Sequence, residues 1–392
     1  MEFQTVIYNP TNGAVVRILP GQYIKSRAVL DRLCPSPPDV RLKFFYYNCP
    51  FPLSANDFRV LPHGPHRAPA LRKADGSDPT TAIIKQTGKW LLDHYNTLLI
   101  RFEGGMGDYL DQADVVTHLM RNYPDKNFSL ILRGERAAAL KMLEGFSGFK
   151  VITEDSQTKI RGASLKFSEI DRLGGDYPPG GKVGVYSAIA GLNKPAERAR
   201  IVIPEALIRS TVDRLSSAGW SGGPITIGLH TMSGNTNTKS IRPGVALELL
   251  APLLDLPGVQ FLQFGGAGEE RLNHPRVVGL QGALSWPEVF AALSLCDACI
   301  CIDSAILHIA QHLNIPTLSL WGPTSPAAIL AADPGVTCLV STKPCAGCAR
   351  YECDHCDCMD RFNKKVLMKE LKGLIRTSEK KILPLDSDTN GA

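Results

Sequence analysis

Residues 301–326 read CIDSAILHIAQHLNIPTLSLWGPTSP, and this stretch decides the fold. ACICID, which ends at Asp303, predicts a buried strand, SAILHIAQHL predicts a helix, and PTLSLWG predicts a second buried strand. Strand–helix–strand alternation favours a parallel sheet covered by helices. Asp303 and Ser304 stand where the first strand ends and the helix begins, so we expect them at a sheet edge beside free helix N–H groups.

The same alternation extends on both sides of this stretch. Strands are predicted at ITIGLH (225–230) and VQFLQFGG (259–266), and helices at VALELLAPLLD (245–255), SWPEVFAALSLC (285–296) and the C-terminal 363–381. An earlier set contains the strands TLLIRF, SLILRG and FKVIT and the helices 109–123 and 135–146. Two α/β halves joined near residues 200–222 predict a ligand cleft between them.

Residues 1–96 show a different pattern, in which short segments with strand propensity are separated by proline- and glycine-containing turns. We therefore predict four parts: a mainly-β module at 1–96, a first α/β domain at 97–215, a second α/β domain at 216–375, and a tail at 376–392. A cysteine-rich segment at 344–359 belongs to the third part.

Composition excludes several classes of protein. Hydrophobic residues make up 44% and charged residues 21% of the 392, as in ordinary globular proteins. The net charge of +5 is scattered along the chain, which suits an anionic ligand but predicts no nucleic-acid partner. The N-terminus lacks a signal-peptide pattern and no apolar run is long enough to span a membrane, so we expect a cytoplasmic protein.

The turn RFEGGMGD (101–108) carries the first candidate for chemistry. Gly105 and Gly107 let backbone N–H groups approach a ligand, but an acid at the helix start would repel a phosphate. Asp108 therefore fits a general base that faces a neutral hydroxyl. The alternative is an aspartate that caps the helix and takes no part in chemistry.

Further candidates lie at the strand ends of the second half. His308 is one helical turn beyond Ser304, and the WGPT turn brings Gly322 and Thr324 to the same edge. The alternative is an ordinary capped helix with a buried histidine. A polar loop from Thr231 to Arg242 contains Lys239, which could neutralise a diphosphate leaving group or be simply solvated. Gly265, Gly266 and Glu269 could hold a nucleoside.

The order GGMGD, lysine loop, FGG, LQGALSWPEVFAAL and IDSAILHIAQHLNIPTLSLWGPT resembles glycosyltransferase family 9, the ADP-heptose-dependent heptosyltransferases. The resemblance covers roughly residues 97–375. It implies a GT-B type fold, in which an acceptor-side Rossmann-like domain at 97–215 and a nucleotide-sugar Rossmann-like domain at 216–375 face a cleft. This sequence departs from the family pattern at two places. The family's usual threonine-glycine after the aspartate is Ser304-Ala305 here. The family's lysine–aromatic–proline run is KSIRP (239–243) here, so Lys239 and Arg242 are both candidates for the residue that faces the diphosphate.

The resemblance implies roles for these residues. Asp108 would deprotonate the acceptor hydroxyl, and Lys239 would stabilise the leaving diphosphate in a single displacement with inversion. The donor would be ADP-heptose, and no catalytic metal would be needed because lysine and helix N-termini carry the phosphate charge. The nucleotide sugar would be bound by Gly105, Gly107, Thr231, Arg242, Gly265, Gly266, Glu269, Asp303, Ser304, Ala305, His308, Gly322 and Thr324.

The segment 344–359, PCAGCARYECDHCDCM, holds five cysteines. C-x-x-C at Cys345 and Cys348 with two more thiols nearby predicts a four-thiolate tetrahedral metal site. Spacing alone would add Cys353 and Cys356. The resemblance favours Cys353 and Cys358, with Cys356 as a substitute, and it implies iron, whereas thiolates alone would equally suit zinc. Such a closed site holds structure and activates no substrate. The dispersed cysteines, Cys296 to Cys301 and Cys338 among them, are expected to be mostly small buried hydrophobes.

Within the family, the extra N-terminal module and the cysteine finger are similar to the bacterial autotransporter heptosyltransferases. This similarity implies that heptose is transferred to serine hydroxyls of an autotransporter passenger, and that the enzyme forms a large homo-oligomer. One alternative is a lipopolysaccharide-core heptosyltransferase of the same family. Another is a metal-binding or redox protein centred on the cysteines.

Overall fold

The computed structural model describes residues 85, 88–89, 91–153, 163–167, 180–234, 236–350, 353 and 357–382, together with five strands nearer the N-terminus. Among these strands, β1 (Gln4–Tyr8) pairs antiparallel with β2 (Val15–Ile18) and β3 (Phe45–Cys49), and β4 (Phe58–Leu61) pairs with β5 (Ala70–Lys73). Apart from residues 85, 88–89 and 91–96, the rest of the predicted N-terminal module lies outside the described residues, so the module stays a prediction.

The first α/β half is built on a parallel sheet in the order β8 (Lys150–Thr153), β7 (Asn127–Leu132), β6 (Thr97–Arg101), β9 (Ser164–Lys166). Its helices are α3 (Met106–Asn122), α4 (Gly134–Leu140) and α5 (Gly181–Ile189). The predicted helix 135–146 is shorter than expected. Leu143 instead forms a β-bridge with Ile201, and a 3₁₀ turn follows at Phe146–Gly148, so a long-range contact overrides the local helix preference.

The second half contains six parallel strands in the order β12 (Val277–Gly279), β11 (Val259–Gln263), β10 (Ile225–His230), β13 (Ala298–Ile302), β14 (Thr317–Trp321), β15 (Val336–Val340). Every residue of β10, β13 and β14 is buried, which explains their unbroken apolar runs, because helices cover both faces of the sheet. The sequence predictions for these three strands are confirmed, whereas β15 was not predicted.

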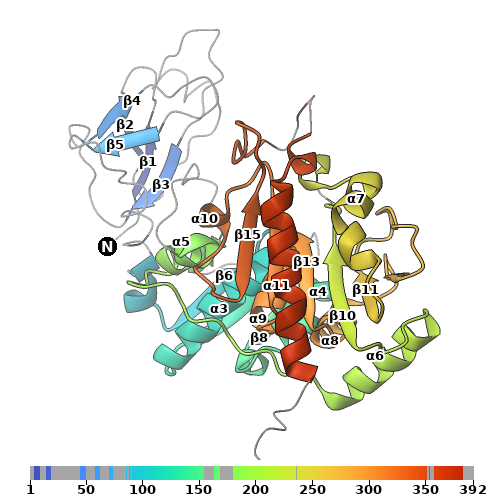
Figure 1. Ribbon diagram of the computed structural model, residues 1–392. Helices are drawn as coiled ribbons and strands as arrows, with labels where there is room; N and C mark the ends of the chain where they lie inside the picture. Colours follow the sequence, from blue (N-terminus) through green and yellow to red (C-terminus); the bar gives the residue numbers. More distant parts are fainter. Residues whose placement is uncertain are drawn as a thin grey trace, which may run out of the picture.

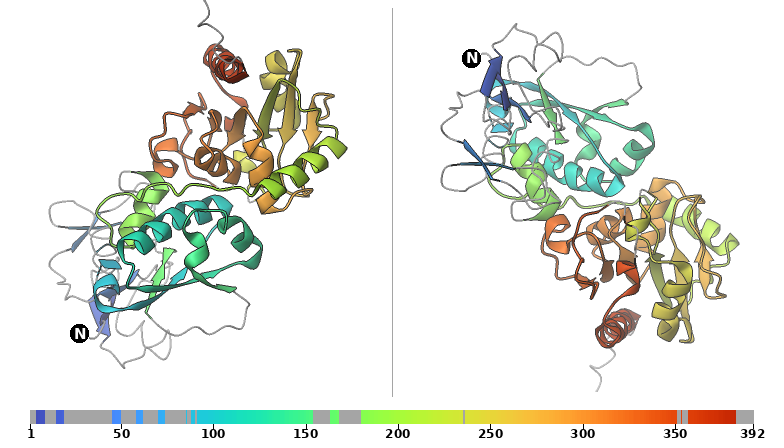
Figure 2. Two further views of the ribbon diagram at one scale, coloured as in Figure 1. Left: turned by 90° about the horizontal axis from the view of Figure 1, so that it is seen from below. Right: turned by 90° about the horizontal axis from the view of Figure 1, so that it is seen from above.

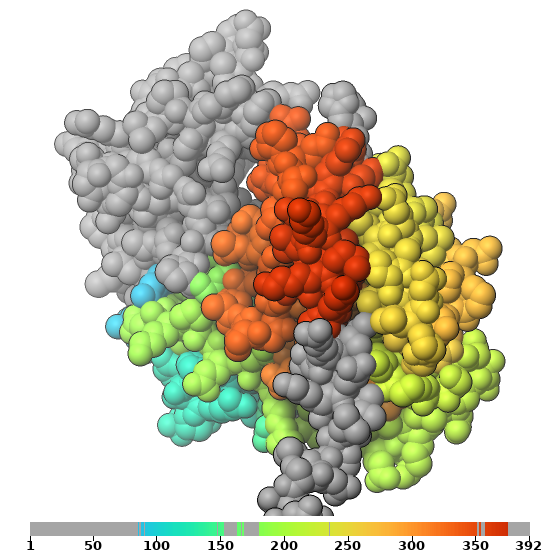
Figure 3. Space-filling model, viewed as in Figure 1, coloured from blue at the N-terminus to red at the C-terminus, as the bar shows by residue number. Residues whose placement is uncertain are grey.

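Helices cover the two faces of this sheet. On one face, α7 (Pro243–Leu254) and α11 (Lys364–Ile382) pack on Ile227, Phe261 and Leu320. On the other face lie α8 (Trp286–Ser294) and α9 (Ala305–His312), and α6 (Glu205–Ser217) packs on α8. The predicted boundary at 215–216 thus falls inside α6. Figure 1 shows α11 crossing the sheet, and Figure 3 shows it on the outer surface.

The two halves lie side by side and are joined by the segment between α5 and α6 (Figure 2). They contact one another through three helix pairs, α3 with α9, α4 with α8, and α5 with α10 (Pro326–Ile329). One apolar cluster continues across this contact, from Phe102 and Leu110 in the first half to Phe290 and Trp321 in the second. Across the described ranges, no helix combines the length and apolar character that a membrane crossing needs.

Candidate active site

The donor-side residues gather at the carboxyl ends of adjacent strands. β10 and β13 are paired in parallel with His230 opposite Cys301, so the chain leaving each strand emerges at the same edge. Asp303 follows β13, and Ser304 is the N-cap of α9. Lys239, on the 3₁₀ turn η4 (Asn237–Lys239), reaches this edge and its Nζ lies 3.3 Å from Asp303 Oδ2. Lys239 and Asp303, which the sequence suggested from two separate motifs, therefore lie side by side at this edge.

A histidine that sequence reasoning missed connects two of the predicted residues. The Nδ1 atom of His230 lies 2.9 Å from Ser304 Oγ, and its Nε2 lies 3.3 Å from Glu269 Oε2. Burial disfavours ionisation of Glu269, but the His230 ring and the backbone at Gly266 outweigh it and hold the pKa of this carboxyl below its usual range. The Gly265–Gly266 turn thus places Glu269 against the end of β10.

Several buried polar atoms at this edge have spare hydrogen-bonding capacity. Thr231 Oγ1, Thr324 Oγ1 and Gln281 Nε2 are buried and have no hydrogen-bond partner in the part of the chain that the structure describes. An unpaired buried polar group costs free energy of about 1–3 kcal/mol. Three such atoms around one sheet edge are typical of a site that a polar ligand completes.

Asp108 lies in the first half, in the first turn of α3. Its Oδ2 accepts the N–H of the N-cap residue Gly105 at 2.8 Å, so the capping alternative describes part of its role. Its Oδ1 accepts from Lys182 Nζ at 2.5 Å and from Tyr186 Oη at 3.2 Å. Burial opposes ionisation, but the Lys182 ammonium and the Gly105 N–H outweigh it and lower the pKa of Asp108. The carboxylate is therefore ionised at neutral pH.

The structure explains why two positions of GGMGD are occupied by glycine. Gly104 has φ of +89°, and a Cβ there would lie 2.4 Å from Asp108 Oδ2. Gly107 lies against the other half, where a Cβ would come within 2.6 Å of His308 Cδ2. Gly107 was predicted to contact the nucleotide sugar, and in the structure it allows α3 and α9 to approach.

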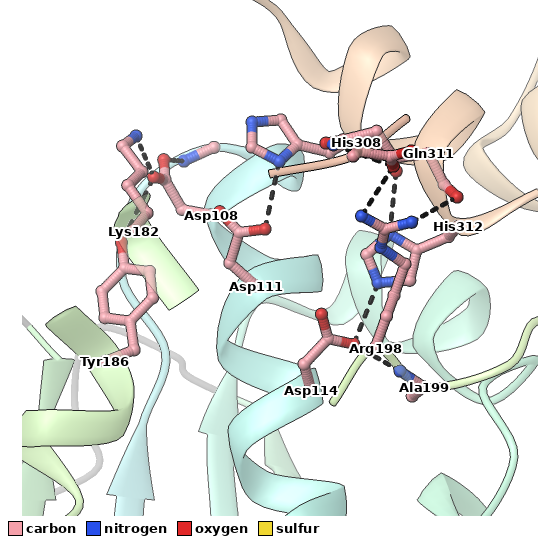
Figure 4. Close-up of polar contacts among 12 residues, drawn as sticks. Asp108, Asp111, Asp114, Lys182, Tyr186, Arg198, Ala199, His308, Gln311 and His312 are labelled. Carbon is pink, nitrogen blue, oxygen red and sulfur yellow. Dashed lines mark hydrogen bonds and ion pairs between the residues drawn. The ribbon is translucent and has the colours of Figure 1, made fainter. Parts of the chain in front are cut away.

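Two aspartate–histidine pairs join α3 to α9 (Figure 4). Asp111 Oδ1 lies 3.1 Å from His308 Nδ1, and Asp114 Oδ1 lies 2.9 Å from His312 Nε2. Burial opposes protonation of His308, but Asp111 outweighs it and raises the pKa of the ring. A cavity of about 10 Å³ borders both pairs, enough for about one water molecule.

These contacts bring the charges of both halves together. Burial opposes the ammonium of Lys182, but Asp108, and beyond it Asp303 in the other half, raise its pKa. The charge of His308 likewise acts on Asp108. The structure thus places Asp108, His308, Asp303 and Lys239 around one inter-half contact, although the sequence suggested them from three separate motifs.

Not every predicted residue faces this contact. Arg242 is 72% exposed and forms an ion pair with Asp360, directed at the cysteine-rich segment. Gly322 packs under Met359, and its carbonyl accepts the N–H of Gly347 at 2.8 Å. Ala305 is the first residue of α9.

Sequence reasoning missed Lys182, Tyr186 and the partners in the second interface pair. Lys182 follows two glycines with positive φ, Gly180 and Gly181, in a stretch without helical or strand periodicity. Its partner Asp108 is 74 residues away in the sequence. The weak signal in the sequence is the glycine- and proline-rich run GGDYPPGGK (174–182), which is typical of a loop but indicates no particular residue.

The cysteine-rich segment was predicted to hold a metal. Cys345 and Cys348 lie on one turn, where the N–H of Cys348 donates to the carbonyl of Cys345 at 3.1 Å. Cys358 is buried at the start of η5 (Cys358–Asp360). Thiolates are suitable ligands for iron or zinc. Among the described residues, however, no three His, Cys, Asp or Glu side chains gather as a metal site requires, and Cys356 lies outside that set, so the site stays a prediction.

Three of the dispersed cysteines are buried, as predicted, and Cys338 is not. Cys296, Cys299 and Cys301 are buried, which confirms the prediction of small hydrophobic residues. Cys338 is exposed because it lies on the edge strand β15.

Comparison with known proteins indicates a family. Residues 268–358 match the model of glycosyltransferase family 9 (heptosyltransferase). A segment of 99 residues is 33% identical to lipopolysaccharide heptosyltransferase 1 of Pseudomonas aeruginosa, and it spans 24% of this chain and 28% of that protein.

Solved structures share the fold. The ADP-heptose LPS heptosyltransferase II of E. coli aligns with a TM-score of 0.56 at 16% identity, over 72% of this chain and 99% of that one. The iron-containing dodecameric glycosyltransferase TibC from enterotoxigenic E. coli H10407 aligns with a TM-score of 0.52 at 13% identity, over 73% of this chain and 76% of that one. TibC has also been solved in complex with ADP-D-β-D-heptose. At these identities the likeness shows an α/β fold with parallel sheets. Together with the match over residues 268–358, these comparisons show that the chain is similar to glycosyltransferase family 9 (heptosyltransferase).

Proposed function

We propose that the chain is a heptosyltransferase that takes heptose from ADP-heptose and transfers it, with inversion, to a hydroxyl group. The observation that carries the proposal is the placement of an ionised, half-buried carboxylate, Asp108, beside a strand-end site that contains Lys239 and the N-terminus of α9. An acceptor and an anionic donor need these two environments on opposite sides of one reacting carbon.

The donor side supplies positive charge and hydrogen bonds. Lys239 and the free N–H groups at the start of α9 would neutralise the charge that develops on the leaving diphosphate. Asp303 holds the Lys239 ammonium at 3.3 Å, so the lysine is positioned before a ligand arrives. Glu269 would accept hydrogen bonds from ribose hydroxyls. No metal ion is required for this part of the chemistry.

The acceptor side supplies the base. The acceptor O–H proton would pass to Asp108 as the oxygen attacks the anomeric carbon and the carbon–oxygen bond to the diphosphate breaks. Lys182 makes Asp108 a weak base in the ligand-free enzyme. We propose that the entering hydroxyl displaces the Lys182 ammonium, which restores basicity to the carboxylate at the moment of transfer.

For the acceptor we propose serine hydroxyls of an autotransporter passenger. The extra residues 1–96 and the cysteine-rich segment support this choice, together with the shared fold of TibC. The second candidate is a lipopolysaccharide core, which is favoured by the local identity to the Pseudomonas heptosyltransferase.

One experiment separates these acceptors. The purified chain is incubated with ADP-heptose and either a passenger protein or a lipopolysaccharide core that lacks heptose, and each product is weighed by mass spectrometry. A mass increase of one heptose unit on the passenger supports the proposal. An increase on the lipid core alone would favour the second candidate, and none on either would contradict the activity.

We further propose that Cys345, Cys348, Cys353 and Cys358 hold a structural iron and that the protein forms a large homo-oligomer in the cytoplasm. Metal analysis and light scattering of the wild type and of Cys345→Ser/Cys348→Ser test this, with Cys338→Ser as the matched control because Cys338 is an exposed thiol outside the segment. We expect loss of metal in the double variant alone. Retained metal would contradict this assignment, whereas thiol or redox turnover without heptose transfer would favour a redox protein.

A further inference from the structure

His230 is the polar side chain at the donor edge to which neither the sequence nor the proposed reaction assigned a role. It occupies the last position of β10 and lies between Ser304, at the start of α9, and Glu269, in the loop after β11. We propose that His230 is a positioning residue of the donor site and takes up a proton when a nucleoside diphosphate binds. This inference rests on the proposed donor site.

The contacts fix where the proton lies before a ligand binds. The carboxylate of Glu269 faces Nε2 at 3.3 Å and favours a proton on that nitrogen. In the neutral ring Nδ1 is then an acceptor, and the Ser304 hydroxyl 2.9 Å away donates to it. The single O–H of Ser304 is therefore directed at the histidine, and its oxygen presents lone pairs to any incoming phosphate. This arrangement does not favour an anion.

A proton taken up from solvent at His230 Nδ1 reverses the direction of the hydrogen bond between His230 and Ser304. When Nδ1 is protonated it donates to Ser304 Oγ, and the hydroxyl hydrogen rotates away and becomes available to a phosphate oxygen. No covalent bond forms or breaks apart from the N–H bond at Nδ1. Ser304 then adds a donor to the N–H groups of α9, and these groups converge on the same anion.

The charges around the ring favour this step once a diphosphate is present. Glu269 faces the ring from the β11 loop, Asp303 precedes Ser304, and Lys239 approaches from η4 with its ammonium directed at Asp303. Burial raises the pKa of the cross-strand neighbour Cys301, which stays a neutral thiol. A bound diphosphate adds negative charge to a setting that already contains two carboxylates and one ammonium, so it stabilises the imidazolium.

A second observation indicates that a ligand belongs here. Thr231, the residue after His230, is 4% exposed, and its Oγ1 has no hydrogen-bond partner in the described portion of the chain. A buried hydroxyl at that place costs free energy until a ligand group pairs with it.

Titration calorimetry with ADP tests the inference. Binding to the full-length wild type is measured near pH 7.5 in two buffers of different ionisation enthalpy, which gives the number of protons taken up. His230→Asn keeps an acceptor for Ser304 near Nδ1 but cannot become charged. We expect net proton uptake by the wild type, loss of that uptake in the variant, and ADP affinity lower by about tenfold, the size of one lost charge-assisted hydrogen bond.

The controls separate positioning from folding. His274→Asn, in a half-buried loop histidine of the same half, should leave proton uptake and affinity unchanged. The affinity losses of His230→Asn and Ser304→Ala should not add in the double variant, because both remove the same hydroxyl–phosphate bond. Should His230→Asn not fold, ¹⁵N shifts of the wild-type His230 ring should change from one protonated nitrogen to two when ADP is added.

The outcomes distinguish two failures. If ADP binds the wild type without proton uptake, or if His230→Asn keeps the uptake of the wild type, this inference is overturned and the proposed donor site stands. Should the wild type bind no ADP at all, the donor site itself is wrong.

Discussion

The acceptor side and the donor side of the inter-half contact are prepared in opposite ways. On the acceptor side, the Asp108 carboxylate is engaged by Gly105, Lys182 and Tyr186. On the donor side, buried hydroxyls of Thr231 and Thr324 have no hydrogen-bond partner in the described residues. The donor edge therefore has unused hydrogen-bonding capacity, whereas the base is held by the protein itself.

This difference predicts an order of events. A donor can bind to groups whose heavy atoms are already in place, with only the proton uptake at His230 and the rotation of the Ser304 hydroxyl. An acceptor hydroxyl must first compete with Lys182 for the carboxylate. Changes on the donor side should therefore alter nucleotide affinity and catalysis together, and changes on the acceptor side should alter catalysis alone.

Replacing the base tests this separation with the largest expected effect. Asp108→Ala should slow heptose transfer by about 10²–10⁴-fold, because a positioned general base contributes that much. Affinity for ADP should stay close to that of the wild type, as measured by calorimetry. Asp213→Ala, in an exposed aspartate of α6, is the matched control. Unchanged turnover in Asp108→Ala would contradict the assignment of the base.

Lys239→Met should reduce turnover by about 10²-fold and also weaken ADP binding, because the charge opposite the leaving diphosphate is lost. Arg242→Met should cost much less, since the Arg242 side chain is directed at Asp360. Steady-state rates and ADP titration of the two variants decide between the lysine and the arginine. An equal or larger loss for Arg242→Met would reverse the assignment.

The sequence predicts the donor side better than the acceptor side, and there is a physical reason. Asp303, Ser304 and Lys239 follow strands whose apolar runs are buried on both faces, so local pattern places them at one edge. Lys182, in contrast, lies in a stretch without periodicity, and its contact with Asp108 depends on how α3 and α5 pack. The same holds for Asp111 and Asp114, whose partners are on the other half. Long-range pairing of charges leaves no local pattern.

Removing the competing ammonium should shift the pH profile. In Lys182→Met the main cause that lowers the pKa of Asp108 is gone, while burial still raises it and the Gly105 N–H and the His308 charge remain. The acidic limb of kcat/KM should therefore move to higher pH. Lys126→Met, which removes an ammonium on a surface turn, serves as control. A profile that coincides with the wild type would show that Lys182 does not control the base.

The smallest effect is expected for stability. The pKa of His308 is raised in the folded protein, so its ion pair with Asp111 stabilises fully below the ordinary histidine pKa near 6.5 and is lost as pH rises through the raised value. The contribution is about 1.4 kcal/mol for each unit of the rise. In urea unfolding between pH 6 and 9, the wild type should lose stability with rising pH more steeply than His308→Gln. If the stability of the wild type and of His308→Gln changed with pH in parallel, a charged His308–Asp111 pair would be contradicted.

The central claim, that the donor binds at the ends of β10 and β13 with its sugar directed at Asp108, is tested most directly by a crystal structure of the chain with ADP-heptose. The account predicts that the diphosphate contacts Lys239 and the start of α9, that Thr231 Oγ1 gains a hydrogen-bond partner, and that the anomeric carbon faces Asp108. A nucleotide sugar bound away from these residues, or with its sugar directed away from α3, would contradict it.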